Sequence, residues 1–193
     1  MDAADSCFYV VTKRALDILG ATIGLCLTGL LYVPLAIAIK LDSPGPVFFS
    51  HERLGEHERR FKLLKFRTMH LELGPYGPKP TANDDRVTRV GRFLRRTSLD
   101  ELPQFYNVLR GEMSLVGPRP EQLPFMVYYR GAERRRFEVK PGLTGWWQVN
   151  GRPQPMYEHG EYDLYYVEHR SLRLDLLILL RTAKAVISGE GAV

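Results

Sequence analysis

Residues 18–39 read ILGATIGLCLTGLLYVPLAIAI and carry no charged side chain. As an α-helix this 22-residue stretch would be about 33 Å long, close to the thickness of the hydrocarbon core of a bilayer. A buried helix of that length in a soluble protein should have one polar face, and this stretch has none. The stretch therefore predicts an N-terminal membrane anchor.

The anchor divides the chain into three parts. Lys13 and Arg14 precede the apolar run, and residues 36–38 (AIA) resemble a signal-peptidase site. The run is longer than the apolar region of a usual signal peptide, however, and no polar segment precedes the alanines, so we expect it to be retained. Proline and glycine in residues 42–46 (DSPGP) should end the helix. We predict a tail over residues 1–12, an anchor helix over 13–41 and one domain over 42–193.

The domain itself predicts an α+β fold that is rich in helices and has short strands. Residues 47–49 and 61–68 are strand candidates, residues 87–94 and 99–109 have helical spacing, and residues 74–80 form a Gly/Pro loop. Residues 172–187 predict a last, strongly apolar helix that packs on the core or lies as an amphipathic helix at the membrane interface.

Composition excludes several classes of protein. The chain has 193 residues, a formal net charge of +5, and arginines clustered at residues 59–60, 92–96 and 134–136. Such charge suits an anionic membrane, a nucleic acid or a phosphorylated substrate, but no nucleic-acid-reading motif is present. Two cysteines allow no disulfide framework, and the five histidines lack the spacing of a structural zinc site.

The segment SLDELPQ, residues 98–104, carries the most suggestive chemistry. Ser98 followed by Glu101 fits a capping box, and on spacing alone this is the favoured interpretation. The same position keeps a carboxylate ionised and holds phosphate, because a helix N-terminus attracts negative charge. Two adjacent acids, Asp100 and Glu101, also suit a magnesium ion that bridges substrate phosphates.

Basic residues surround this segment in the sequence. Arg92, Arg95 and Arg96 lie a few residues upstream and suit a phosphate, although they also suit a solvated helix face. Arg119 is held between two prolines, which predicts a rigidly presented guanidinium. Three further basic residues lie on the second strand candidate, and we expect them to share a face: Lys62, Lys65 and Arg67.

Five motifs together resemble one known family. They are DSPGPVFF (42–49), FKLLKFRTM (61–69), SLDELPQ (98–104), NVLRGEMSLVGPRP (107–120) and KPGLTGWWQVNGR (140–152). In this order they are similar to the bacterial sugar transferases, which are monotopic polyprenyl-phosphate phosphoglycosyl transferases. The resemblance runs from about residue 13 to residue 192 and points to the minimal, single-domain form.

The resemblance implies an enzymatic activity. The family transfers a sugar-1-phosphate from a nucleotide diphosphate sugar, usually a UDP-sugar, to a polyprenyl phosphate such as undecaprenyl phosphate. UMP is released, and the product starts the assembly of an exopolysaccharide, O-antigen or other glycan at the cytoplasmic face of the bacterial inner membrane. The motifs specify neither the sugar nor the oligomeric state.

The family's functional residues fall on positions of this chain. By resemblance, Asp100 is the nucleophile that forms a covalent phosphosugar intermediate, and Glu101 assists with Mg²⁺ or with protons. Mg²⁺ is expected at Asp100 and Glu101. Arg95 matches a phosphate-contacting arginine of the family. Three further residues are candidates for substrate binding: Lys65, Arg119 and Arg152.

The anchor departs from the family pattern in one respect. Many members have a Ser-Pro pair midway along the helix, which makes it enter and leave the membrane by the same face. Here the comparable place is Thr28-Gly29-Leu30, and Pro34 follows about one turn later. Basic residues flank both ends of the apolar run, which favours two cytoplasmic ends. We therefore predict a re-entrant helix that is broken around Gly29 to Pro34.

Two other functions fit the sequence. One is a membrane phosphotransferase that uses a different nucleotide or lipid. The other is a membrane-tethered binding or scaffold protein without catalysis, in which residues 98–101 only cap a helix.

Overall fold

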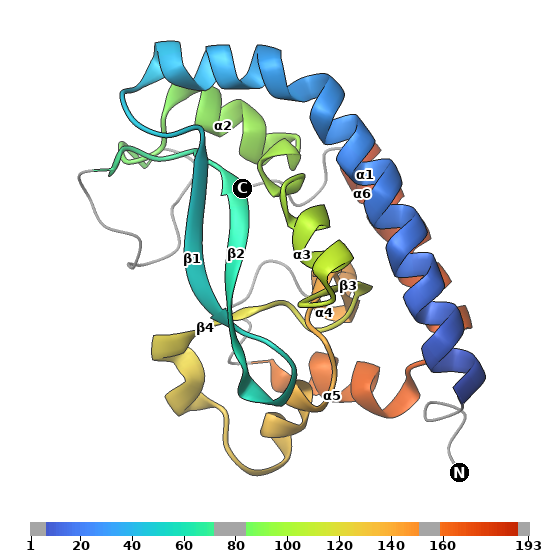
Figure 1. The fold of residues 1–193 in the computed structure, drawn as a ribbon. Helices are drawn as coiled ribbons and strands as arrows, with labels where there is room; N and C mark the ends of the chain where they lie inside the picture. Colours follow the sequence, from blue (N-terminus) through green and yellow to red (C-terminus); the bar gives the residue numbers. More distant parts are fainter. Residues whose placement is uncertain (1–6, 72–83, 151–158, 189–193) are drawn as a thin grey trace.

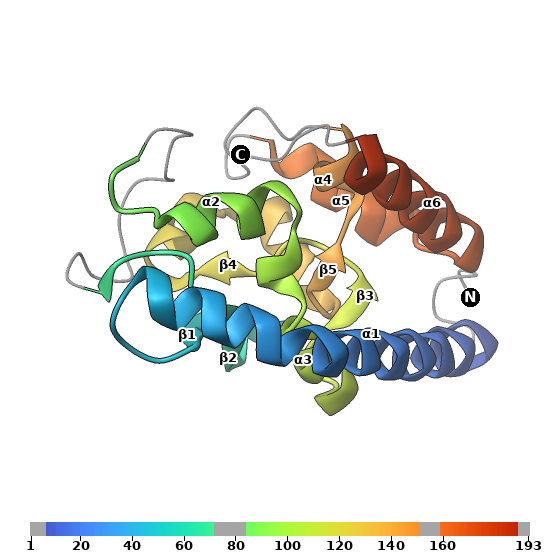
Figure 2. The same cartoon turned by 90° about the horizontal axis from the view of Figure 1, so that it is seen from above.

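A computed structural model describes residues 7–71, 84–150 and 159–188 (Figure 1). The expected loop at residues 74–80 lies outside these ranges, as does Arg152. The described parts form a mixed fold of helices and two small sheets, as the sequence predicts. The long helix α1 (Cys7–Asp42) runs along one side of the remaining elements (Figure 2).

Helix α1 begins six residues before the start predicted for the anchor, and among the described residues it is the one helix long and apolar enough to cross a membrane. Most of its apolar side chains are exposed, and a narrow stripe is buried against the domain. The buried stripe consists of Tyr9, Asp17, Ala21, Gly24, Thr28 and Ile39. Close packing needs the small residue in this stripe, because a Cβ on Gly24 would lie 2.4 Å from the ring of Phe105.

The predicted break in α1 is wrong, since the helix is one continuous element across Gly29 and Pro34. Instead α1 bends partway along its length (Figure 1). Two local features favour a bend without a break. Pro34 cannot donate a backbone hydrogen bond, and the hydroxyl of Thr28 donates to the carbonyl of Gly24 at 2.7 Å.

The first sheet is antiparallel, with strand order β2-β1-β4. Strand β1 (Phe48–Leu54) starts in the predicted strand at 47–49 but is longer, and β2 (Arg60–Phe66) matches the prediction at 61–68 closely. In their register Phe49 faces Lys65 and His51 faces Leu63. The two-residue strand β4 (Glu121–Gln122) pairs with the end of β1, which brings the segment around Arg119 to this sheet.

The predicted helix at 99–109 is two elements. A 3₁₀ turn, η4 (Leu99–Glu101), is followed by α3 (Gln104–Arg110), and Pro103 lies between them, where its missing N–H ends the ladder of hydrogen bonds. Helix α2 (Arg89–Arg96) precedes this turn and is shifted by two residues from the predicted 87–94. Side chains of α1, β2 and α3, together with one residue just before β3, form one core cluster, which consists of Ala21, Phe61, Leu63, Val108 and Met113.

The C-terminal part is built around a parallel strand pair, β3 (Ser114–Val116) and β5 (Gly142–Thr144). The helices α4 (Trp146–Asn150) and α5 (Gly160–His169) pack side chains near this pair, whereas the 3₁₀ segments η5 (Leu123–Tyr128) and η6 (Gly131–Glu138) pack against the end of β1. The last helix, α6 (Leu172–Ser188), confirms the prediction at 172–187. A short turn, η2 (Glu56–Glu58), joins β1 to β2.

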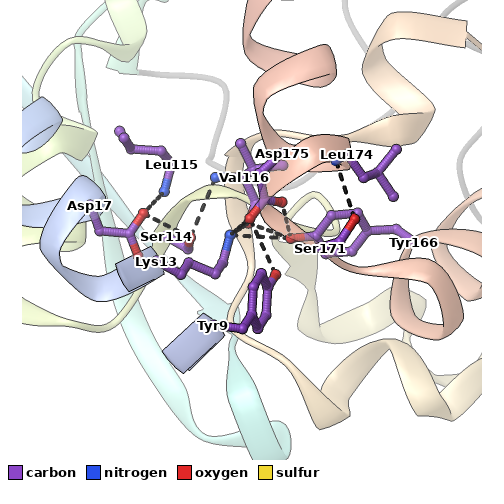
Figure 3. A network of polar contacts seen from close by, with 10 residues as sticks. All are labelled: Tyr9, Lys13, Asp17, Ser114, Leu115, Val116, Tyr166, Ser171, Leu174 and Asp175. Carbon is purple, nitrogen blue, oxygen red and sulfur yellow. Dashed lines mark hydrogen bonds and ion pairs between the residues drawn. The ribbon is translucent and has the colours of Figure 1, made fainter. Parts of the chain in front are cut away.

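Polar side chains attach the first turns of α1 to this C-terminal part (Figure 3). Lys13 Nζ lies 2.8 Å from Asp175 Oδ2 on α6 and 3.0 Å from the carbonyl of Val116 on β3. Asp17 Oδ1 accepts hydrogen bonds from Ser114 Oγ at 2.9 Å and from the backbone N–H of Leu115 at 2.8 Å. The start of α1 is therefore held by charged and backbone groups of the domain as well as by apolar packing.

Candidate active site

The acid pair lies in the 3₁₀ turn η4, between the end of α2 and the start of α3. The capping-box interpretation of Ser98 is wrong. Ser98 has a left-handed backbone conformation, with φ of 57°, and its side chain makes no capping hydrogen bond. Its N–H bonds the carbonyl of Arg95 at 3.1 Å, so Ser98 reverses the chain after α2 and turns Asp100 into the domain.

Replacing Ser98 by Gly tests this assignment. Glycine adopts the left-handed conformation without the Cβ clash, so the variant should be more stable by about 0.5 kcal/mol, a rise of about 1–2 °C in thermal midpoint. A capping residue would instead lose stability in this exchange. The matched control is Ser50→Gly in the middle of β1, which should lower the midpoint because glycine weakens a strand. Equal drops in both variants would contradict the left-handed role.

Two cations converge on Glu101. Lys65 Nζ lies 2.7 Å from Glu101 Oε1 and 3.4 Å from Asp100 Oδ2, so one ammonium group bridges both acids. Arg119 Nη2 lies 3.1 Å from the same Glu101 oxygen. The side chain of Asp100 is 9% exposed and that of Lys65 is 17% exposed, so these charges interact in a largely desolvated place. The structure thus brings together four of the predicted site residues.

The two acids differ in electrostatics. Burial raises the pKa of Asp100, and the nearby charge of Glu101 adds to this, while Lys65 and Arg95 oppose it. Burial also acts to raise the pKa of Glu101, but Lys65 and Arg119 outweigh it and hold that pKa well below its usual range. Glu101 is therefore a fixed anion that orders two cations, whereas Asp100 is a poorly solvated carboxyl group whose oxygens are less constrained.

The prediction that Lys62, Lys65 and Arg67 share one face is wrong. Lys62 is exposed on the outer face, and Arg67 is buried at 2% exposure. Arg67 binds the segment that follows α1, because it donates to the carbonyl of Pro46 at 2.6 Å and to the carbonyl of Ser43 at 2.8 Å. Only Lys65 reaches the acids, since a strand turns alternate side chains to opposite faces and Arg67 already lies beyond the end of β2.

Arg95 is the one upstream arginine that approaches the acids. It is half-buried, its Nε donates to Thr68 Oγ1 at 2.9 Å, and it acts on the charge of Asp100. Arg92 donates instead to the carbonyl of Val87, and Arg96 is exposed. Spacing from Asp100 alone does not distinguish these three arginines, whereas their positions around α2 do.

The segment that carries Arg119 is fixed by two other arginines. Arg136 Nη2 donates to the carbonyl of Arg119 at 2.7 Å, and Arg53 Nη1 donates to the carbonyl of Pro120 at 3.2 Å. Arg136 is only 2% exposed and forms ion pairs with Glu121 and Asp163. The rigidity expected from the flanking prolines is therefore reinforced by hydrogen bonds to successive carbonyl groups.

Carboxylate oxygens remain available at the acid pair. Among the described residues, Asp100 Oδ1 and Glu101 Oε2 receive no hydrogen bond. The described chain also gathers no cluster of three or more His, Cys, Asp or Glu that would enclose a metal ion. Magnesium is commonly held by one or two carboxylates together with substrate phosphates and water, so the two acids fit an ion that arrives with a phosphorylated substrate.

Two site residues escaped prediction from the sequence. His51 accepts a hydrogen bond from Arg53 Nε at 2.6 Å, and burial, together with Arg53, Lys65 and Arg119, lowers its pKa to about 3, so it is neutral. Thr68 binds Arg95. Alternation along β1 places His51 on the face of Arg53, but nothing in the sequence indicates that this face points to the acids.

A buried carboxyl group near Lys65, Arg95 and Arg119, in a chain with a long apolar N-terminal helix, fits a protein that handles phosphorylated substrates at a membrane. Comparison with known proteins agrees with this class. The sequence model for bacterial sugar transferases matches residues 8–189. The chain therefore belongs to the bacterial sugar transferase family.

Named relatives cover nearly all of the chain. It is 41% identical over 95% of its length to the UDP-N-acetylgalactosamine-undecaprenyl-phosphate N-acetylgalactosaminephosphotransferase of Aeromonas hydrophila. It is 45% identical over 88% of its length to the UDP-glucose:undecaprenyl-phosphate glucose-1-phosphate transferase of Escherichia coli K12. It is 42% identical over 94% of its length to the uncharacterized sugar transferase EpsL of Bacillus subtilis. The matches span 45%, 39% and 90% of these relatives, respectively.

Proposed function

We propose that the protein is a phosphoglycosyl transferase that moves a sugar-1-phosphate from a UDP-sugar to a polyprenyl phosphate, with undecaprenyl phosphate as the preferred lipid. The observation that carries the proposal is the buried Asp100 beside Lys65, Glu101 and Arg119, with Arg95 close by. The names of the Aeromonas and E. coli relatives support the choice of nucleotide and lipid. The product is the first lipid-linked intermediate of an exopolysaccharide or a related glycan.

The reaction proceeds in two displacements at one phosphorus. A carboxylate oxygen of Asp100 attacks the sugar-linked phosphorus of the UDP-sugar, the bond to the bridging oxygen breaks, and UMP leaves with that oxygen. An oxygen of the polyprenyl phosphate then attacks the same phosphorus and displaces the carboxylate of Asp100. The products are a polyprenyl diphosphate sugar and the free enzyme, and two partial reactions of this kind give ping-pong kinetics.

The poor solvation of Asp100 favours its role as the nucleophile, and the nearby cations offset the negative charge of the substrate phosphates. Water contacts a 9%-exposed carboxylate poorly, so Asp100 is less masked by solvent than a surface acid. Lys65, Arg95 and Arg119 offset the negative charge of the phosphates that must approach it. Glu101 holds Lys65 and Arg119 in place through Oε1. Asp100 and Glu101 would hold Mg²⁺, which when bound offsets charge on the phosphate oxygens.

Replacing Lys65 by Met tests the role of the bridging cation. Removal of the charge that contacts both acids should lower kcat for UMP release by roughly 10²–10³-fold, as for other groups that stabilise developing charge. Lys62→Met on the exposed side of the same strand is the matched control, and its kcat for UMP release should stay near that of the wild type. Equal activity of the two variants would exclude Lys65 from the site.

The position of α1 supports a re-entrant insertion from one face of the membrane, and we propose that this is the cytoplasmic face of the bacterial inner membrane. Near its start Lys13 pairs with Asp175, and near its end Ile39 packs on Phe66 and Leu94, so both ends contact the same domain. A straight span would carry one end away from that domain by the thickness of the bilayer. Lys13 and Arg14 donate hydrogen bonds to groups of the domain, so these contacts, and not their positive charge alone, favour a re-entrant helix.

An apolar surface for the lipid follows the outer side of α1. Its exposed side chains are Phe8, Val10, Val11, Leu16, Ile18, Leu19, Ile23, Leu27, Leu30, Tyr32, Val33, Ile37 and Leu41. Helix α6 adds exposed Leu176, Leu177 and Leu180, so it suits an interfacial position.

Labelling of an engineered cysteine tests this topology. Thr12→Cys, in a chain whose Cys7 and Cys26 are replaced by Ser, should react with a membrane-impermeant maleimide only after the cytoplasmic face is opened. Lys40→Cys at the other end of α1 is the matched comparison and should behave in the same way. Labelling of Thr12→Cys from the outer face of intact cells would mean a true span.

The activity itself is tested by a screen of UDP-sugars. Purified protein in nanodiscs with undecaprenyl phosphate and Mg²⁺ should release UMP with one or a few UDP-sugars, and EDTA should stop the release until Mg²⁺ is restored. Release with another nucleotide sugar only, or with another lipid only, would favour the alternative phosphotransferase. No release with any donor, from protein that is folded, would favour a binding or scaffold protein.

A further inference from the structure

Thr68 lies where β2 meets α2, two residues after the strand ends, and is 7% exposed. Its carbonyl accepts the N–H of Thr88, the residue that caps α2. The first turn of α2 rests directly on the Thr68 backbone, because a Cβ on Gly91 would lie 2.1 Å from the Thr68 carbonyl oxygen. Only glycine permits this approach, so the backbone of Thr68 and the helix that carries Arg95 are held at a fixed separation.

Arg95 lies one turn after Gly91 on the same side of α2, which brings its side chain to Thr68. Its Nε donates to Thr68 Oγ1 at 2.9 Å. Within the described residues this is the one hydrogen bond of the Arg95 side chain, and both terminal nitrogens, Nη1 and Nη2, are left for another partner. An arginine with a fixed Nε and two free Nη groups presents the fork that binds phosphate in a bidentate manner.

Arg95 is half-buried and lies near two acids. Burial lowers its pKa, whereas the carboxylates of Asp100 and Asp84 act to raise it. A half-buried guanidinium beside a buried carboxyl group, without an ion pair to it, keeps its two terminal nitrogens available to an anionic ligand.

We propose that Thr68 is a positioning residue, whose hydroxyl fixes the guanidinium of Arg95 so that its two Nη groups meet the diphosphate of the sugar donor beside Asp100. This inference rests on the proposed function and extends it to a residue that touches neither substrate nor the acids. Without the hydroxyl, Arg95 keeps its charge but can rotate about its terminal bonds.

The test is a set of threonine variants with steady-state measurement of UMP release. Thr68→Val removes the hydroxyl at nearly constant shape and should lower kcat/KM for the UDP-sugar by about 10- to 100-fold, as expected for a lost hydrogen bond to a charged group. Thr68→Ser keeps the oxygen and should restore activity to within about threefold. Thr97→Val is the matched control, because within the part of the chain that the structure describes the Thr97 hydroxyl bonds only carbonyls of its own helix.

A double-mutant cycle with Arg95→Ala separates positioning from a structural effect. If Thr68 acts through Arg95, Thr68→Val should change kcat/KM by less than about twofold in the Arg95→Ala background, whereas a general loss of structure would act equally in both backgrounds. Thermal midpoints of all variants accompany the kinetics. If Thr68→Val does not fold, Thr68→Ala takes its place in the cycle.

The outcomes distinguish the inference from the function on which it rests. An active wild type with an unaffected Thr68→Val, or with equal losses in both backgrounds, would overturn the role of Thr68 alone. A folded wild type that releases no UMP from any UDP-sugar would overturn the proposed function, and the positioning role with it.

Discussion

Asp100→Asn is expected to abolish UMP release, with a loss of roughly 10³-fold or more, as is typical when a covalent nucleophile is removed. The amide has nearly the same shape as the carboxylate but cannot form the phosphosugar ester. Because Asp100 is buried, the exchange also removes a desolvated charge, so the folded state should not lose stability. Kinetics and a thermal midpoint measured on the same preparation check both expectations.

Two further variants provide the comparisons for Asp100→Asn. Asp85→Asn, an exposed aspartate near the start of α2, is the matched control and should retain wild-type activity. Glu101→Gln should lose less than Asp100→Asn, because the amide oxygen can still accept from Lys65 and Arg119, although more weakly. Asp100→Asn with unchanged turnover for every accepted UDP-sugar would exclude the covalent mechanism.

Lys13→Met is expected to have the largest effect on stability. Lys13 Nζ reaches Asp175 Oδ2, the hydroxyl of Tyr166 and the carbonyl of Val116, and the side chain of Asp175 is only 6% exposed (Figure 3). Removing one partner of such a pair leaves a buried charge uncompensated, at a cost of about 3 kcal/mol. In a chain of this size the thermal midpoint should fall by about 6–12 °C.

The control for this prediction is Lys40→Met, an exposed lysine at the other end of α1, which should change the stability by less than about 0.5 kcal/mol. The double variant Lys13→Met/Asp175→Leu should recover part of the loss, because it removes the unpaired carboxylate as well. If Lys13→Met and Lys40→Met had the same midpoint, the ion pair would contribute nothing to holding α1 on the domain.

The first and last helices were predictable from the sequence, because composition and hydrophobic periodicity determine them. The apolar run at 18–39 is long and uniform and forms part of the continuous helix α1, and the final helix carries a leucine-rich pattern that has no strand period. The division of the predicted helix at 99–109 follows from Pro103, which the helical spacing of the leucines obscures. Thr28 and Pro34 favour a bend in α1 locally, but the path of the helix also depends on the packing of its two halves against different elements, which a local pattern does not contain.

The candidate site was also predictable only in part, because its geometry depends on contacts between segments that are distant in the sequence. Asp100, Glu101, Lys65, Arg95 and Arg119 were identified through motifs, but their spacing in the sequence does not indicate which cation meets which acid. A serine three residues before a glutamate has the pattern of a capping box, whereas the chain reversal after α2 requires Ser98 in a left-handed conformation. The hydrogen bond between Thr68 and Arg95 depends on the contact that Gly91 permits, which no single-residue signal reveals.

Covalent catalysis by Asp100 is tested by intact-protein and peptide mass spectrometry after incubation with an accepted UDP-sugar in the absence of lipid acceptor. The wild type should release UMP in an amount no greater than that of the enzyme and should gain the mass of one sugar phosphate on the peptide that contains Asp100. Undecaprenyl phosphate added afterwards should remove that mass, and Asp100→Asn should never acquire it. UMP release that requires the lipid from the first turnover, with no adduct on Asp100, would contradict a covalent phosphosugar intermediate.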